Sequence, residues 1–162
     1  MKCICFALTH IAVSPLLCCA LLMTPAARLA AQAQGTPTTT STQATATLTV
    51  QITGLRNGKG IVSLTLYRDS KPVETRNVAI DAGTLSARTE FEKIPQGVYA
   101  VYVFHDENMN GKLDTNFMRM PLEGYGMSNN PRKRMGKPGF DETNFPVNQP
   151  ECSIEIKMVY WQ

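Results

Sequence analysis

The sequence has few of the residues from which common catalytic and metal sites are built. Its 162 residues include only two histidines and five cysteines. One histidine, His10, and four of the cysteines lie within the first 19 residues. The chain also has no serine–histidine–acid arrangement, no glycine-rich phosphate loop and no Cys–His cluster. The commonest hydrolase, nucleotide-binding and zinc-site designs are therefore not indicated.

Charge is also scarce and nearly balanced. Charged residues make up 18% of the chain, and the formal net charge is +3. Two basic residues, Lys2 and Arg28, belong to a segment that we expect to be removed, which leaves 14 basic side chains against 13 acidic ones. Such a balance gives no bulk attraction to nucleic acid or to an anionic membrane, so we expect no nucleic-acid partner.

Residues 1–33 have the pattern of a signal peptide. Lys2 is followed by a largely apolar run over residues 4–23, and the segment ends in the small-x-small triplet at 31–33. Pro15 interrupts the run, which argues against a retained membrane anchor. We therefore expect an exported protein, periplasmic or extracellular, that is not an integral membrane protein after processing.

A lipoprotein signal is the alternative form of export. Cys18 is a candidate for lipidation, but Leu17 precedes it where such signals normally have a small residue, so an outer-membrane lipoprotein is the weaker prediction. After cleavage only Cys152 would remain, without a partner for an internal disulfide, and we expect it to be a small buried residue. Residues 34–46 are rich in Thr, Ser, Ala and Gln, and they are predicted to form a flexible tether.

Apolar and polar residues alternate with a period of two along much of the remaining chain, which is typical of strands with one buried face. Asn57-Gly58 favours a tight turn, and it predicts a hairpin between the first two of these segments. We therefore predict that residues 47–162 form an all-β domain, a single β-sandwich of about seven antiparallel strands, immunoglobulin-like or similar. The candidate strands are residues 48–53, 62–66, 78–80, 85–91, 98–104, 140–147 and 154–160.

One long segment, residues 106–139, interrupts this regular spacing. Loops of more than 30 residues inside a compact domain are usually functional or disordered. This one contains Phe117, Tyr125, five methionines and two leucines, an apolar content that favours an ordered, self-packed loop.

The long loop begins with a pattern that suits calcium. In D-x-N-x-N-G-x-L-D, alternate oxygen-bearing side chains can point inward, while Gly111 permits the sharp bend and Leu113 anchors the loop in the core. Phe117 takes the place of the bidentate glutamate of an EF-hand, so any calcium site is weaker or is completed by Glu107 or Glu123. The candidate Ca²⁺ ligands are Asp106, Asn108, Asn110, Lys112 through its carbonyl, and Asp114.

Two other interpretations of the same residues stay open. Asp and Asn side chains also bond their own backbone in metal-free turns. His105 is a nitrogen ligand that suits zinc or copper better than calcium. A hydrolytic or metal-dependent enzyme would gather its site from the residues His105, Asp106, Asp114 and Glu123.

Two further features suggest binding. A basic cluster at Arg132, Lys133, Arg134 and Lys137 suits a phosphate, an acidic glycan or a lipid headgroup, or else it forms a solvated loop rim. Tyr125 lies between two glycines, and it either stacks on a sugar or pins the loop to the sandwich.

Three stretches resemble a bacterial family of unknown function, the domain-of-unknown-function 2141 (DUF2141) family. They are FEKIPQGVY at 91–99, VFHDENMNGKLDTN at 103–116 and PLEGYGMSNN at 121–130. The resemblance spans residues 47–162, with departures at Arg119-Met120 and at Met127. It implies an exported protein with a sandwich similar to transthyretin-like or prealbumin-like modules, and it implies no established activity.

These observations lead to two hypotheses of different class. The first is a non-catalytic envelope module whose loop, with calcium at 106–114, presents a surface to an envelope protein, a glycan or a lipid. The second is the enzyme described above, and it requires its four residues to converge in one cleft. The first is favoured because the sequence supplies turn and ligand chemistry without a recognisable nucleophile.

Overall fold

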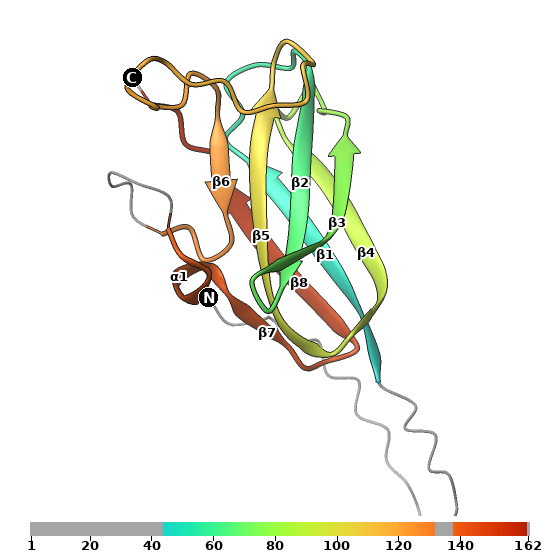
Figure 1. The fold of residues 1–162 in the computed structure, drawn as a ribbon. Helices are drawn as coiled ribbons and strands as arrows, with labels where there is room; N and C mark the ends of the chain where they lie inside the picture. Colours follow the sequence, from blue (N-terminus) through green and yellow to red (C-terminus); the bar gives the residue numbers. More distant parts are fainter. Residues whose placement is uncertain (1–43, 132–137, 162) are drawn as a thin grey trace, which may run out of the picture. The chain divides into compact units, whose positions relative to one another are not determined.

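The computed structural model describes residues 44–131 and 138–161, which form two packed β-sheets (Figure 1). The smaller sheet has the order β4-β1-β8, and the larger one has the order β3-β2-β5-β6, with β7 paired to one end of β5. Almost all regular structure in these residues is strand, which confirms the predicted all-β sandwich. The elements are β1 Thr45–Thr53, β2 Ile61–Arg68, β3 Lys71–Val78, β4 Ala87–Pro95, β5 Gly97–Asp106, β6 Tyr125–Met127, α1 Phe140–Thr143, β7 Phe145–Val147 and β8 Glu151–Lys157.

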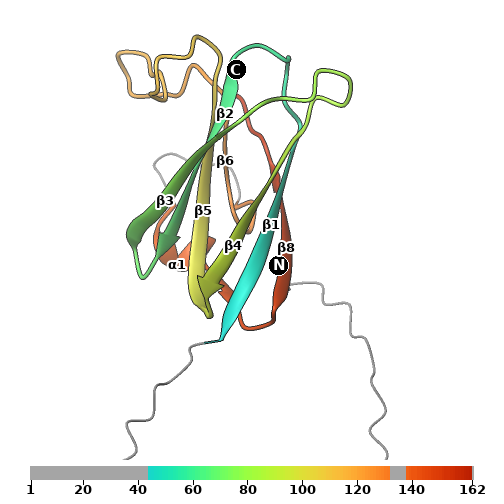
Figure 2. The same ribbon diagram turned by 90° about the vertical axis from the view of Figure 1, so that its right-hand side faces the viewer.

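The core lies between the two sheets, which Figure 2 shows nearly edge-on. In β1, β2 and β8 every second residue is buried in the core, as the period of a strand requires. From the smaller sheet these include Leu48, Val50 and Ile52, and from the larger sheet Val62, Leu64 and Leu66. Burying an aliphatic side chain of this size contributes about 1.5–3 kcal/mol. The alternation visible in the sequence therefore identified the faces of both strands correctly.

The predicted hairpin at Asn57-Gly58 is wrong. β1 pairs with β4 and β8, whereas β2 pairs with β3 and β5, so residues 54–60 carry the chain from one sheet to the other. Gly54 and Gly60 both have positive φ, and a Cβ atom on Gly60 would lie 1.9 Å from the carbonyl oxygen of Asp106. Glycine is needed at these positions because the link between the two sheets takes positive φ values and passes close to the backbone of Asp106, and not because it forms a two-residue turn.

Two further strand predictions need correction. The third strand lies at Lys71–Val78, earlier than residues 78–80, and it follows a tight turn in which Asp69 and Ser70 have φ values of 50° and 64°. Residues 140–147 hold one helical turn before the short strand β7. All strand pairings are antiparallel except β1 with β8, which run parallel.

The strand β1 begins at Thr45, two residues inside the range predicted to be a tether. The predicted signal peptide and residues 34–43 of the tether lie outside the described residues. Cys152 is buried, as predicted, and it is disulfide-bonded; the other four cysteines lie outside the described residues. The described residues include no helix that is long and apolar enough to span a membrane.

The loop after β5 is ordered between residues 107 and 124, but its apolar side chains are not packed as expected. Phe117 is 93% exposed, and Met118, Leu122 and Leu113 are also exposed. The loop keeps its shape through polar contacts instead, and the expectation of a self-packed loop is wrong.

Candidate functional site

Asp106 fixes the start of the loop. It is the last residue of β5, and it is fully buried. Its Oδ1 accepts the backbone N–H of Asn110 at 3.0 Å, and its Oδ2 accepts that of Gly111 at 2.7 Å. A short carboxylate can reach forward to these N–H groups because Gly111 takes a φ of 76°. The sequence pattern therefore identified Gly111 correctly as the residue at which the chain bends.

The other side chains of the predicted calcium pattern converge on Asp114. Asn108 donates from Nδ2 to Asp114 Oδ2 at 2.7 Å, and Asn110 donates from Nδ2 to Asp114 Oδ1 at 3.0 Å. The amide oxygen of Asn108 accepts the N–H of Asn110, and that of Asn110 accepts the N–H of Lys112. Lys112 has an exposed side chain, and the use of its carbonyl as a ligand stays a prediction.

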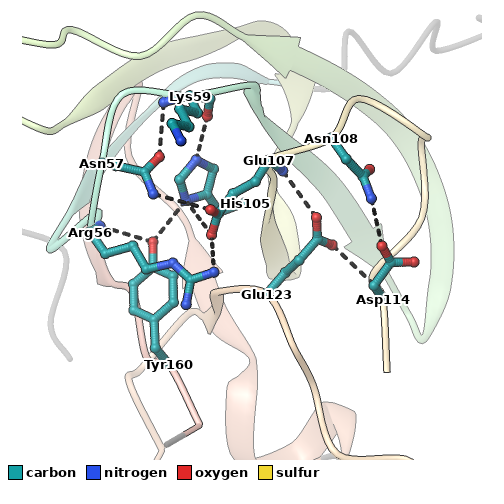
Figure 3. A network of polar contacts seen from close by, with 9 residues as sticks. All are labelled: Arg56, Asn57, Lys59, His105, Glu107, Asn108, Asp114, Glu123 and Tyr160. Carbon is teal, nitrogen blue, oxygen red and sulfur yellow. Dashed lines mark hydrogen bonds and ion pairs between the residues drawn. The ribbon is translucent and has the colours of Figure 1, made fainter. Parts of the chain in front are cut away.

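Glu123 closes the loop from the far end. Its side chain is buried, and the two carboxylate oxygens accept the backbone N–H groups of Glu107 and Asp114, each at 3.0 Å (Figure 3). One carboxylate thus joins the first and last residues of the segment 107–114. The sequence suggested Glu123 as a spare calcium ligand or as part of an enzyme site, and this clamp was not predicted.

Asp106 and Glu123 are both buried carboxylates, 0% and 5% exposed, and neither forms an ion pair within the described residues. Buried charges in proteins are usually paired with an opposite charge or bound to a metal. The side chains gathered here offer oxygen but no sulfur or ring nitrogen, which suits a hard cation such as calcium. Each oxygen of Asp106 accepts one hydrogen bond and keeps a second lone pair. The kinds of donor atom therefore suit calcium, but in this structure the amide nitrogens of Asn108 and Asn110 face Asp114, and the described residues place no three His, Cys, Asp or Glu side chains together as a metal-binding group.

His105 lies apart from this oxygen cluster, because neighbouring residues of a strand point to opposite faces. Its ring is fully buried, with Nδ1 2.8 Å from the hydroxyl of Tyr160 and Nε2 2.7 Å from the carbonyl oxygen of Lys59. The carbonyl can only accept, so Nε2 carries a proton. No ring nitrogen remains for a metal, and within the described residues no three His, Cys, Asp or Glu side chains form a metal-binding group. The zinc or copper interpretation of His105 finds no support.

A polar network around His105 connects the β1–β2 link, the end of β5 and the C-terminal segment (Figure 3). The backbone N–H of Arg56 donates to the Tyr160 hydroxyl at 3.1 Å, and the Arg56 guanidinium lies 2.5 Å from Glu107 Oε1. Asn57 donates from Nδ2 to Glu107 Oε2 at 3.1 Å. Sequence patterns gave no sign of this network, because its members lie up to about a hundred residues apart in the chain.

The network sets the ionisation of Glu107. Partial burial raises the pKa of Glu107, but the hydrogen bonds from Asn57 and Arg56 and the positive charge of Arg56 lower it more, so the pKa lies below its ordinary value. Tyr160 shows the opposite effect, since burial raises the pKa of its hydroxyl. The ionised Glu107 and the protonated Tyr160 are therefore both favoured near neutral pH.

The residues of the enzyme hypothesis do not share a cleft. His105 is enclosed by Tyr160 and Lys59, Asp106 bonds the backbone of its own loop, and Glu123 bonds two further N–H groups. None of the four lines the cavity that the described residues form on the larger sheet. The arrangement supplies no exposed acid–base pair.

That cavity lies on the outer face of the larger sheet, and it has a volume of about 370 Å³. Its floor follows from strand register: Phe104 is paired with Tyr125, and the next outward residue of β5, Tyr102, lies between β2 and Met127 of β6. Leu113, Thr115 and other loop residues form one wall. The aromatic side chains that line it are Tyr67, Tyr102, Phe104, Tyr125 and Trp161.

Sequence reasoning missed the cavity, although one signal was present. Residues 98–104 form a near-continuous apolar run, a pattern typical of a central strand covered on both faces. The strand is central in its sheet, but part of its outer face is left open and forms the floor of the aromatic cavity. Tyr125 both pairs with β5 and lines the cavity, so neither of the two roles considered for it describes it fully. The basic cluster at 132–137 lies outside the described residues.

Comparisons with known proteins support the family resemblance. No curated protein and no solved structure matches the chain. The family model described as "Uncharacterized protein conserved in bacteria (DUF2141)" matches residues 50–155, well over half of the chain. This range contains the calcium pattern, Glu123 and all but one of the aromatic residues that line the cavity. The chain therefore belongs to the DUF2141 family of bacterial proteins.

Proposed function

We propose that this protein is an exported, non-catalytic binding module of the cell envelope, in which a calcium-stabilised loop at 106–114 helps to present a binding surface. The observation that carries the proposal is the convergence of Asn108 and Asn110 on Asp114, beside the buried carboxylates of Asp106 and Glu123, which have no ion-pair partner in the described residues. Calcium takes six to eight oxygen ligands, and part of that number can come from backbone carbonyls and water. The partners considered are an envelope protein, a glycan or a lipid.

Calcium binding requires a small rearrangement of the loop. The amide nitrogens of Asn108 and Asn110 face Asp114, so both amides must turn to bring their oxygens to an ion at that place. The three hydrogen bonds to Asp114 would be replaced by ligand contacts to the cation, and the amide oxygens would give up the bonds that they accept from the N–H groups of Asn110 and Lys112. The backbone contacts of Asp106 and Glu123 need not change, because these oxygens have lone pairs to spare.

Thermal unfolding in calcium and in chelator tests the proposal. A ligand that binds only the folded state stabilises it by about 2.7 kcal/mol at a hundredfold excess over its Kd. For a domain of this size that corresponds to a rise in Tm of roughly 10 °C. The substitution Asp114→Asn is expected to abolish most of this rise, because it removes the charge at the point of convergence.

Asp81→Asn is the matched control. Asp81 also bonds the backbone of its own turn, with Oδ1 2.8 Å from the N–H of Gly83, but it lies outside the loop. Its variant should keep the full calcium-dependent rise. A wild-type protein whose Tm and loop protease sensitivity are the same in calcium and in chelator would refute the calcium part of the proposal.

A further inference from the structure

We infer that the aromatic cavity is a binding site for a compact organic anion, a molecule with a planar apolar body of one or two rings and one acidic group. This inference goes beyond the proposed function, because a compact organic anion is not an envelope protein, a glycan or a lipid. It rests on the cavity's size, its lining and the one cationic side chain at its rim.

The size of the cavity limits the ligand. Sites that hold small organic molecules measure roughly 300–1,000 Å³. At about 370 Å³ this cavity lies near the lower end of that range. A compact ring system fits such a volume better than a long acyl chain or an oligosaccharide.

The lining of the cavity favours a planar apolar body. Most of its surface is apolar, and five aromatic rings contribute to it. Tyr67 and Tyr102 are already in edge-to-face contact, with ring centroids 5.0 Å apart. Aromatic pairs of this kind contribute about 0.5–1.5 kcal/mol beyond area burial. A ligand ring placed against this floor would gain the same type of contact.

Arg119 supplies the charge complementarity. It is the only charged side chain among the residues that line the cavity, and it forms no ion pair within the described residues. The backbone at Arg119 is held by Asn116, whose carbonyl accepts the N–H of Arg119 and whose Oδ1 accepts the N–H groups of Met118 and Met120. A guanidinium beside an apolar wall binds carboxylate or sulfonate groups in preference to neutral ones.

Trp161, in the C-terminal segment, also lines the cavity. Residue 159 pairs with Tyr125 through two backbone hydrogen bonds of 3.0 and 2.8 Å, and Tyr160 is bonded to His105. These contacts anchor the C-terminal segment on the sheet next to the cavity. Because Trp161 is the only tryptophan in the chain, its fluorescence reports directly on occupancy.

A pair of naphthalene probes tests the inference with the purified protein. Naphthalene-1-sulfonate is anionic, and 1-naphthol, which is neutral at pH 7, has the same two rings without the sulfonate. We expect saturable binding of the anionic probe with one site per chain, together with quenching of Trp161. The neutral probe should bind about five- to tenfold more weakly.

Three variants make the result specific. Arg119→Gln should weaken the anionic probe by about five- to tenfold and change the neutral probe by less than about twofold. Thr115→Trp, at an exposed position of the wall, should fill the cavity and weaken both probes. Arg88→Gln, which removes an exposed arginine of β4, should change neither. Near-ultraviolet circular dichroism checks that each variant keeps the native packing.

Two results would overturn the inference. One is that neither probe binds saturably. The other is that both probes bind equally well and that neither Arg119→Gln nor Thr115→Trp changes their affinity. The measurements are repeated in calcium and in chelator, so that this outcome is separable from the calcium proposal. Probe binding without a calcium-dependent rise in Tm refutes only the calcium site, and a rise without probe binding refutes only the ligand class.

Discussion

Replacing Glu123 by glutamine should destabilise the domain strongly, although the two side chains have the same shape. Both oxygens of Glu123 accept backbone N–H groups, one from Glu107 and one from Asp114. Glutamine keeps one acceptor, but it places an NH₂ group against the other N–H. Two donors then face each other in a buried place, and the remaining hydrogen bond loses its charge.

The size of the effect follows from those two changes. An unsatisfied buried donor costs about 1–3 kcal/mol, and hydrogen bonds to charged groups contribute about 1 kcal/mol more than neutral ones. We expect Glu123→Gln to lower the free energy of unfolding by about 2–4 kcal/mol, which lowers Tm by roughly 8–16 °C. Urea unfolding followed by circular dichroism measures the free energy, and a calorimetric scan measures Tm.

Glu92→Gln is the control, since Glu92 lies on β4 with an exposed side chain and should change stability by less than about 0.5 kcal/mol. The loss in Glu123→Gln should appear both in calcium and in chelator, because the clamp acts through backbone N–H groups. If Glu123→Gln is as stable as Glu92→Gln in both conditions, the clamp does not hold the loop.

Two further predictions concern the surroundings of the loop. Gly60→Ala should destabilise far more than Gly111→Ala in a calorimetric comparison. Both glycines have positive φ, which costs an alanine about 1–2 kcal/mol, but only at Gly60 would the new Cβ meet the backbone of Asp106; equal Tm losses would contradict the close crossing. Glu107→Gln should lower Tm at pH 7 and have a shrinking effect as the pH falls. The lowered pKa of Glu107 means that its ionised form contributes stability above the ordinary pKa of 4.5, and that this contribution is lost on acidification; a difference in Tm that is constant from pH 7 to pH 3 would disprove this.

The sequence predicted the strands better than their partners. Alternation along residues 48–53 and 62–66 identified the buried faces, because the period of a strand is a local property. The same two segments were wrongly joined in a hairpin, since Asn57-Gly58 can begin either a tight turn or a longer crossing. In the structure the segment makes the longer crossing, in which the backbone of Gly60 lies close to that of Asp106. A contact between such distant residues cannot be predicted from a local pattern.

The candidate site was predicted in the same uneven way. Asp106, Asn108, Asn110 and Asp114 lie close together in the chain, and their convergence could be read from spacing alone. The clamp by Glu123 and the network of Arg56, His105 and Tyr160 could not, because they join distant segments. The aromatic cavity depends on strand register and on the position of Trp161 after Tyr160, both of which are tertiary features.

Amide hydrogen exchange of the loop, measured by NMR, tests the central claim that the sandwich holds the segment after Phe104 in a fixed shape. The N–H groups of Gly111 and Asp114 should exchange slowly even in chelator, because Asp106 and Glu123 accept them, and more slowly still in calcium. Exchange of both amides at the rate of an unfolded peptide, with or without calcium, would contradict it.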